Sequence, residues 1–189
     1  MNRLKNLGCY LSGPIDFAEN LGSEWRDELT PFLQNRNVKV FDPLKPMFYG
    51  AAHLTEYKRP VILQMAKARK FEELRTEIKE LNKWDLRAVD LSSFVIVNYR
   101  IDIHMCGTYE EIFEANKQNK PVLLVVDDMT VLPKWIYGRF PHEHMFEGFE
   151  KLKEYLINID ENEDYKFTLA DKKRWLFFDG PWMYREVVT

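Results

Sequence analysis

Glycine, threonine and glutamate residues gather in the stretch from Met105 to Ala115, directly after an apolar segment at 94–99. The apolar segment is typical of a buried strand, and the stretch that follows it opens a helix. A turn at Gly107 and Thr108 would bring backbone N–H groups close to a ligand, and the new helix N-terminus favours negative charge. We expect Glu111 in the first turn, with its carboxylate at the mouth of a sheet. Such a carboxylate could stabilise or capture a developing positive charge.

The same residues have a second interpretation. Thr108 as N-cap, with Glu111 three residues later, would form a capping box that merely starts the helix. This segment alone supports both interpretations equally, so the elements around it have to decide between them.

Strands and helices alternate along the chain. Because the strand segments are apolar throughout, they indicate a parallel sheet that is covered on both faces. We therefore predict one α/β domain over 1–189, an open parallel sheet of the flavodoxin or Rossmann type with helices on both faces. It would carry an inserted helical segment at 44–81 and a C-terminal extension, a helix and an aromatic tail, at 128–189. Strands are expected at 7–11, 38–41, 94–99 and 121–126, helices at 24–34, 61–81, 84–89, 108–118 and 142–157, and 174–178 could form a last strand.

Polar residues follow the predicted strands at three places. Ligands of an open parallel sheet bind beyond the carboxyl ends of its strands, so these residues are expected to converge there. Each place also has a structural interpretation, as a turn for the first group and as an N-cap or solvated acid for Asp90. The three groups are Ser12, Gly13, Pro14 and Asp16; Asp90, Asn98, Tyr99 and Asp102; and Gly107, Thr108 and Glu111.

Composition excludes several classes of protein. The net charge of −3 argues against binding to a nucleic acid polymer, and no apolar run is long enough to span a membrane. Two cysteines give no disulfide framework and fit a reducing cytoplasm. His142 and His144 are two residues apart, which does not place them on one helix face, and His104 and Cys106 lack further ligands nearby. We therefore expect a soluble cytoplasmic protein with no metal and no cofactor.

Three segments, in this order, resemble the nucleoside 2-deoxyribosyltransferase-like superfamily. They are YLSGPI from Tyr10, AVD ending at Asp90 before the third strand, and GTYEEIFEA from Gly107. The resemblance covers roughly residues 7–127 and implies the same fold. It implies Glu111 as nucleophile and Asp90 as the acid near the nucleobase. It also implies a substrate-binding set in which Ser12, Gly13 and Pro14 line the sugar or 5′ side, together with Tyr10, Asp16, Asn98, Gly107 and Thr108.

Two departures from the family pattern bear on specificity. Met105 stands where transferases of the family usually have Asp and where its nucleotide hydrolases often have a small hydroxyl residue. Phe113 replaces the second glycine of the motif and suggests altered packing against the sheet.

The resemblance implies cleavage of the N-glycosidic bond of a deoxynucleoside or deoxynucleotide, with transfer to another free base or to water. Breaking the C1′–N bond builds positive charge on the sugar, which a carboxylate can capture, and the leaving base needs a proton. One alternative is a hydrolase specific for nucleoside 5′-monophosphates. Another is a phosphoribohydrolase of the lysine-decarboxylase-like group, although Met105 and Cys106 stand where its first glycines should be.

A third alternative is a nucleotide-binding module without catalysis, in which Glu111 only caps the helix. Members of the resembled superfamily generally form oligomers whose sites borrow residues from a neighbouring subunit. We therefore expect a homo-oligomer with the aromatic tail, or the helix at 142–157, at or near the interface.

Overall fold

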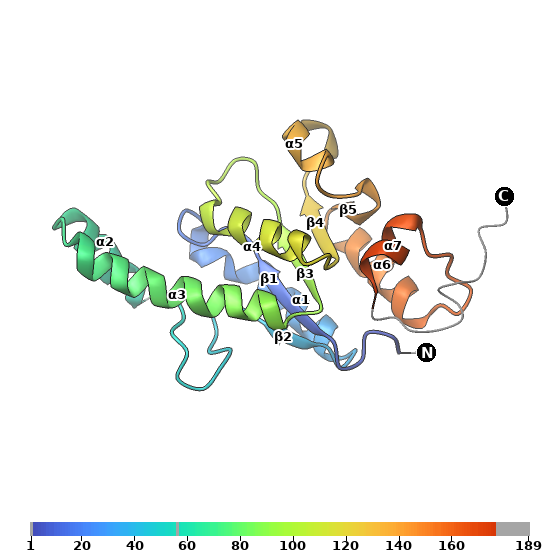
Figure 1. The fold of residues 1–189 in the computed structure, drawn as a ribbon, viewed down its shortest axis with the longest axis horizontal. Coiled ribbons are helices and arrows are strands. Elements are labelled where there is room, and N and C mark those ends of the chain that lie inside the picture. Colours follow the sequence, from blue (N-terminus) through green and yellow to red (C-terminus); the bar gives the residue numbers. More distant parts are fainter. Residues whose placement is uncertain (1, 56, 177–189) are drawn as a thin grey trace.

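The chain folds around one five-stranded sheet, in a computed structural model that describes residues 2–55 and 57–176 (Figure 1). Every neighbouring pair of strands is parallel, and the order across the sheet is β2-β1-β3-β4-β5. This confirms the predicted open parallel α/β fold, with the strand order of flavodoxin-like proteins. The strands are β1 (Gly8–Ser12), β2 (Lys39–Phe41), β3 (Phe94–Asn98), β4 (Val122–Val126) and β5 (Met145–Glu147).

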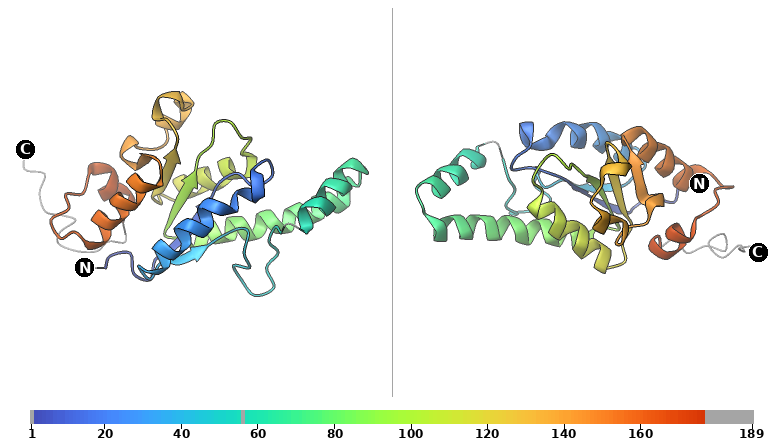
Figure 2. Two further views of the ribbon diagram at one scale, coloured as in Figure 1. Left: turned by 180° about the vertical axis from the view of Figure 1, so that it is seen from behind. Right: turned by 90° about the horizontal axis from the view of Figure 1, so that it is seen from above.

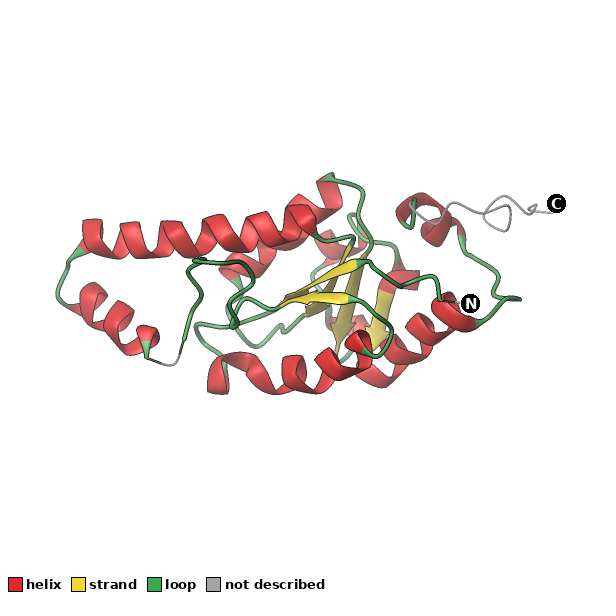
Figure 3. Ribbon diagram, turned by 90° about the horizontal axis from the view of Figure 1, so that it is seen from below, coloured by secondary structure: helices red, strands yellow, loops and turns green. Residues whose placement is uncertain are grey.

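Helices cover both faces of this sheet (Figure 3). Three short 3₁₀ segments lie between the strands and the α-helices: η1 (Glu19–Gly22), η2 (Met129–Val131) and η3 (His142–His144). The α-helices are α1 (Ser23–Gln34), α2 (Lys58–Lys67), α3 (Phe71–Leu91), α4 (Cys106–Lys117), α5 (Lys134–Tyr137), α6 (Phe149–Glu161) and α7 (Leu169–Arg174).

Alternation along the strands divides the core into two layers. In β1, Cys9 and Leu11 pack into the layer formed with α1 and α6, whereas Tyr10 packs into the layer formed with α3, α4 and α5. The period of two along a strand explains this division, because successive side chains point to opposite faces. Tyr10 and Ser12 therefore point to the same side, toward α3 and α4.

The inserted segment forms an arm of two helices that projects from one side of the sheet (Figures 1 and 2). The sequence indicated one helix over 61–81 and a second at 84–89, and this was wrong. The chain instead turns between α2 and α3 at Arg69, whose φ of 58° lies in the left-handed region, and α3 then continues to Leu91. None of the residues of α2 is buried.

The C-terminal third also differs from expectation. The segment predicted as a helix at 142–157 holds the end strand β5 between η3 and α6, because Gly148, with a φ of 90°, separates the strand from the helix. Of the strand suggested at 174–178, the structure describes residues 174–176, and these form no strand. Arg174 ends α7, and Trp175 and Leu176 follow it outside any strand. Its remainder and the aromatic tail lie outside the described residues.

Asp171 anchors α7 to η3 and α6. Its carboxylate is fully buried and accepts hydrogen bonds from His144 Nε2 at 3.0 Å, from Tyr155 Oη at 2.5 Å and from the Thr168 N–H at 2.8 Å. Burial opposes ionisation here, but the bonds from His144 and Tyr155 outweigh it and hold the pKa of Asp171 below its ordinary value. The last described helix is therefore fixed by a polar network.

Candidate active site

The candidate site lies where the sheet changes direction. From β1 the chain goes outward to β2, and it returns through the arm to β3 on the other side of β1. The carboxyl ends of β1 and β3 therefore flank a topological switch point, the usual ligand position in such sheets. β1 ends at Ser12, whose register partner is Val97, and the loop after β3 leads to α4.

Glu111 lies at this point and is buried. Its Oε1 accepts a hydrogen bond from Tyr10 Oη at 2.8 Å, and its Oε2 accepts one from the Ser12 hydroxyl. Both donors come from β1, two residues apart, as the alternation of that strand requires. The structure thus brings together three residues that the sequence analysis had placed in one site.

The capping-box interpretation of Glu111 is wrong. The helix α4 begins at Cys106, and its N-cap is Met105, which makes no side-chain cap hydrogen bond. Thr108 lies inside the helix, and Glu111 lies in the second turn, not in the first as expected. That shift by one turn takes the carboxylate from the mouth of the sheet into a buried position against β1.

The carboxylate of Glu111 is held between opposing effects. Burial raises its pKa above the ordinary value, and the hydrogen bonds from Ser12 and Tyr10 and the charge of Arg26 oppose that rise without cancelling it. Burial and the neighbouring charge of Glu111 raise the pKa of Tyr10 well above its usual range, so the phenol remains a hydrogen-bond donor. Such an environment keeps a carboxylate oriented and only weakly solvated.

The charge of Glu111 acts on a second carboxyl group, that of Asp85 on α3. Burial first, and then the negative charge of Glu111, raise the pKa of Asp85 to about 8. Asp85 therefore keeps its proton at neutral pH and is able to donate it. The sequence analysis missed this residue. A signal was present, because Asp85 lies on the same helix stripe as the buried Leu81 and Ala88, where an acid is unexpected.

Asp90 is not part of this arrangement. It lies in the last turn of α3, before β3 begins, and hence near the amino end of that strand. Its side chain is 46% exposed, and its Oδ1 accepts a hydrogen bond from Gln118 Nε2 at 2.8 Å. Gln118 follows the C-terminal end of α4, whereas the candidate site lies toward the N-terminal end of that helix. The role implied for Asp90 by the resemblance thus has no support in the position of its side chain.

The turn after β1 is close-packed. A Cβ atom on Gly13 would lie 3.1 Å from the Trp25 ring and 3.3 Å from Asn98, so a side chain would force neighbours apart. Pro14 is buried, whereas Asp16 is exposed and its carbonyl oxygen accepts a hydrogen bond from the guanidinium of Arg59, on the arm.

The remaining predicted residues lie around the start of α4 and the end of β3. Gly107 is exposed with nothing within 4 Å of a Cβ position, whereas Thr108 is buried. Asn98 is half-buried at the end of β3, and Asp102 lines a cavity of about 250 Å³ beyond the ends of β3 and β4. Phe113 stacks between two aromatic rings, Tyr109 and Phe140, and so packs toward the segment after α5.

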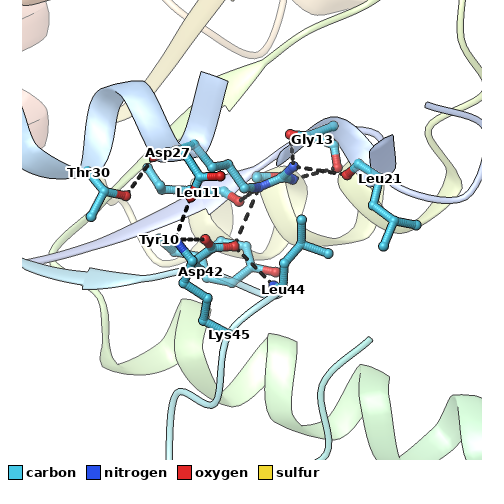
Figure 4. A network of polar contacts seen from close by, with 12 residues as sticks. Tyr10, Leu11, Gly13, Leu21, Asp27, Thr30, Asp42, Leu44 and Lys45 are labelled. Atoms are coloured by element: carbon cyan, nitrogen blue, oxygen red, sulfur yellow. Dashed lines mark hydrogen bonds and ion pairs between the residues drawn. The ribbon is translucent and has the colours of Figure 1, made fainter. Parts of the chain in front are cut away.

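Arg26 of α1 is a further component that the sequence analysis missed. The carbonyl oxygens of Leu11, Gly13 and Leu21 and the carboxylate of Asp42 surround its fully buried guanidinium (Figure 4). Asp42, buried after β2, lies 3.8 Å from Arg26 Nε and accepts the N–H of Leu44 at 3.0 Å. A buried charge of this kind is usually paired and hydrogen-bonded, as it is here.

Comparison of the sequence with protein-family models and with curated proteins finds no match. Within residues 2–55 and 57–176, no helix has the length and apolar character needed to cross a membrane. The same part of the chain holds no group of three or more His, Cys, Asp or Glu side chains arranged to bind a metal ion.

Proposed function

We propose that this protein cleaves the N-glycosidic bond of a deoxynucleoside or deoxynucleotide, with Glu111 as the nucleophile and Asp85 as the general acid. The observation that carries the proposal is the buried carboxyl group of Glu111 at the switch point of the sheet, held through both oxygens by Tyr10 and Ser12. Asp85 adds a second carboxyl group on which the charge of Glu111 acts. Glu111 accepts hydrogen bonds through both oxygens, and the raised pKa of Asp85, about 8, keeps the proton of Asp85 in place at neutral pH. Pairs of acids whose environments assign them different protonation states are typical of glycosidic chemistry.

In the first step, a Glu111 oxygen bonds to C1′ as the C1′–N bond breaks. The electron pair of that bond leaves with the base, which takes the proton of Asp85. In the second step, a second free base, or water, attacks C1′ of the glycosyl ester. The proton of the incoming group passes to Asp85, and Glu111 leaves as the carboxylate. Tyr10 and Ser12 stabilise that carboxylate, so their hydrogen bonds favour release of the sugar.

Transfer to a second base is the outcome that we propose, by the resemblance to the deoxyribosyltransferases. Hydrolysis of a nucleoside 5′-monophosphate is the second candidate. It is favoured by the start of α4, where Gly107 is exposed and Met105 makes no side-chain cap hydrogen bond. Free N–H groups at a helix N-terminus suit a phosphate.

A substrate panel tests the proposal. Deoxynucleosides, ribonucleosides and their 5′-monophosphates are incubated with and without a second free base, and released base and new nucleoside are measured by chromatography. Glu111→Gln should abolish release from the substrate that the protein cleaves, whereas Asp90→Asn, the matched change at an exposed carboxylate, should leave it near normal. Mass spectrometry on a slow substrate should show a sugar on the peptide containing Glu111.

Each outcome of the panel has a distinct meaning. A new nucleoside shows transfer, and free base without an acceptor shows hydrolysis. Normal turnover by Glu111→Gln would rule out the mechanism. No release from any substrate, with nucleotide binding seen by calorimetry, would instead indicate the binding module.

A further inference from the structure

We propose that Arg26 is a positioning residue that orients Glu111 through the backbone around Ser12 and, together with Asp42, sets the pH range in which Glu111 and Asp85 work. This inference rests on the proposed function for its catalytic meaning. Its physical content, the effect of one buried ion pair on two carboxyl groups, can be measured independently of turnover.

The first part of the argument is geometric. The guanidinium of Arg26 donates from Nε to the Leu11 carbonyl at 3.3 Å and from Nη2 to the Gly13 carbonyl at 3.1 Å. These two carbonyls belong to the residues on either side of Ser12, whose hydroxyl donates to Glu111. One rigid group thus fixes the backbone on both sides of the residue that holds the nucleophile.

The same guanidinium also holds a strained segment. Nη1 donates to the Gly22 carbonyl at 2.7 Å and lies 3.5 Å from the Leu21 carbonyl. Asn20, Leu21 and Gly22 all have positive φ, and a branched residue such as Leu21 adopts this conformation at a cost. Arg26 therefore ties this turn to the end of β1, and a lysine, with a single nitrogen, cannot reach all four carbonyls.

The second part of the argument is electrostatic. The charges that act on Arg26 belong to four residues: Asp42 after β2, Tyr10 of β1, Glu111 of α4 and Asp85 of α3. Burial raises the pKa of both Glu111 and Asp85, and the charge of Arg26 opposes the rise at both. Asp42 acts in the opposite sense on Asp85, because its negative charge adds to the rise.

Loss of Arg26 and loss of Asp42 should therefore shift the pKa of Asp85 in opposite directions. Activity in the proposed mechanism requires ionised Glu111 and protonated Asp85. It therefore falls at low pH as Glu111 gains a proton, and it falls at high pH as Asp85 loses its proton. Arg26→Met removes the positive charge and should shift both limbs of the pH profile to higher pH. Asp42→Asn removes the negative charge and should shift the alkaline limb to lower pH.

Arg26→Lys is the matched control. It keeps the charge but loses the planar fork, so turnover should fall while the pH profile stays where it is in the unchanged protein. A role in folding alone would give three less stable proteins with the same profile, which would overturn the proposal. Arg26→Met leaves Asp42 with Lys45, whose Nζ lies 3.5 Å from Asp42 Oδ2, as its remaining ion partner. If Arg26→Met does not fold, the opposed behaviour of Asp42→Asn and Arg26→Lys carries the test.

The titrations are followed by NMR of the ¹³C-labelled carboxyl groups of Asp and Glu, alongside the pH–rate profile. Opposite shifts of the Asp85 midpoint in Arg26→Met and Asp42→Asn support the inference, even if no substrate is cleaved and the proposed function fails. Unmoved midpoints, or shifts of the same sign in both variants, overturn it even if the protein cleaves nucleosides.

Discussion

Replacing Asp85 by Asn should make the protein both more stable and less active. In the folded chain the pKa of Asp85 is about 8, against 3.8 for an unperturbed carboxyl. Between these two values the folded state binds more protons at this position than the unfolded state does. Stability contributed by this group is therefore greatest at low pH and is lost as pH rises toward 8. Asn carries no such penalty, because it does not ionise in either state.

The size of the effect follows from the interval between the two pKa values. pH 7 lies about three pH units above the unperturbed pKa of 3.8 and below the folded-state pKa of about 8. Each of these units destabilises the folded state by about 1.4 kcal/mol, which gives a penalty of roughly 4 kcal/mol at pH 7. Since Asp85 is only half-buried and solvent screens part of this penalty, we expect a gain of about 2–4 kcal/mol for Asp85→Asn at pH 7. Turnover should fall by about 10²–10⁴-fold, the usual contribution of a general acid.

The assay is urea unfolding of both proteins at pH 5, 7 and 9, with turnover measured on the same samples. The difference in unfolding free energy should widen from pH 5 to pH 7 and widen further, by a smaller amount, from pH 7 to pH 9, because the folded-state pKa is about 8. Asp90→Asn, at an exposed carboxylate, should change stability by less than about 0.5 kcal/mol at every pH. A stability difference for Asp85→Asn that is the same at all three pH values would refute the reasoning.

Three further changes have defined outcomes. Tyr10→Phe removes a hydrogen bond to a buried carboxylate, so the acid limb of the pH profile should move to higher pH while the circular dichroism spectrum is kept. Asp171→Ala should lower the free energy of unfolding by about 3–5 kcal/mol, because His144 loses its buried partner, and should leave the pH profile unchanged. We predict a homo-oligomer by light scattering, with the aromatic tail or the region of α6 at the interface. A monomeric full-length chain contradicts this, and an oligomer that survives truncation at Asp171 moves the interface elsewhere.

The sequence predicted the fold because its central strands are apolar on both faces. That pattern is strong in β1, β3 and β4, which lie in the middle of the sheet. It is absent from β5, an edge strand of three residues between a 3₁₀ turn and a helix, which was therefore read as part of the helix. Short edge strands have too few residues to show a period.

The residues of the candidate site were placed together by the sequence only in part, and the residues that it missed have a common cause. Glu111, Tyr10 and Ser12 belong to motifs of contiguous residues, which a sequence shows directly. Asp85 and Arg26 act from inside amphipathic helices, where their place in the apolar stripe was the only sign. The sequence does not give the rotation and tilt of α3 relative to the sheet. These decide that the charge of Glu111 acts on Asp85, whereas Asp90 contacts Gln118.

The hydrogen bond between Tyr10 and Glu111 joins residues 101 positions apart, which makes the site a late product of folding. The chain between them contains β2, the arm and β3, and closing so long a loop costs entropy before any contact is gained. During synthesis, Tyr10 of β1 leaves the ribosome long before Glu111, so the hydrogen bond between them can form only after most of the domain has been made. Recovery of activity after dilution from denaturant should therefore lag behind recovery of helix, since the helices are local and the site is not.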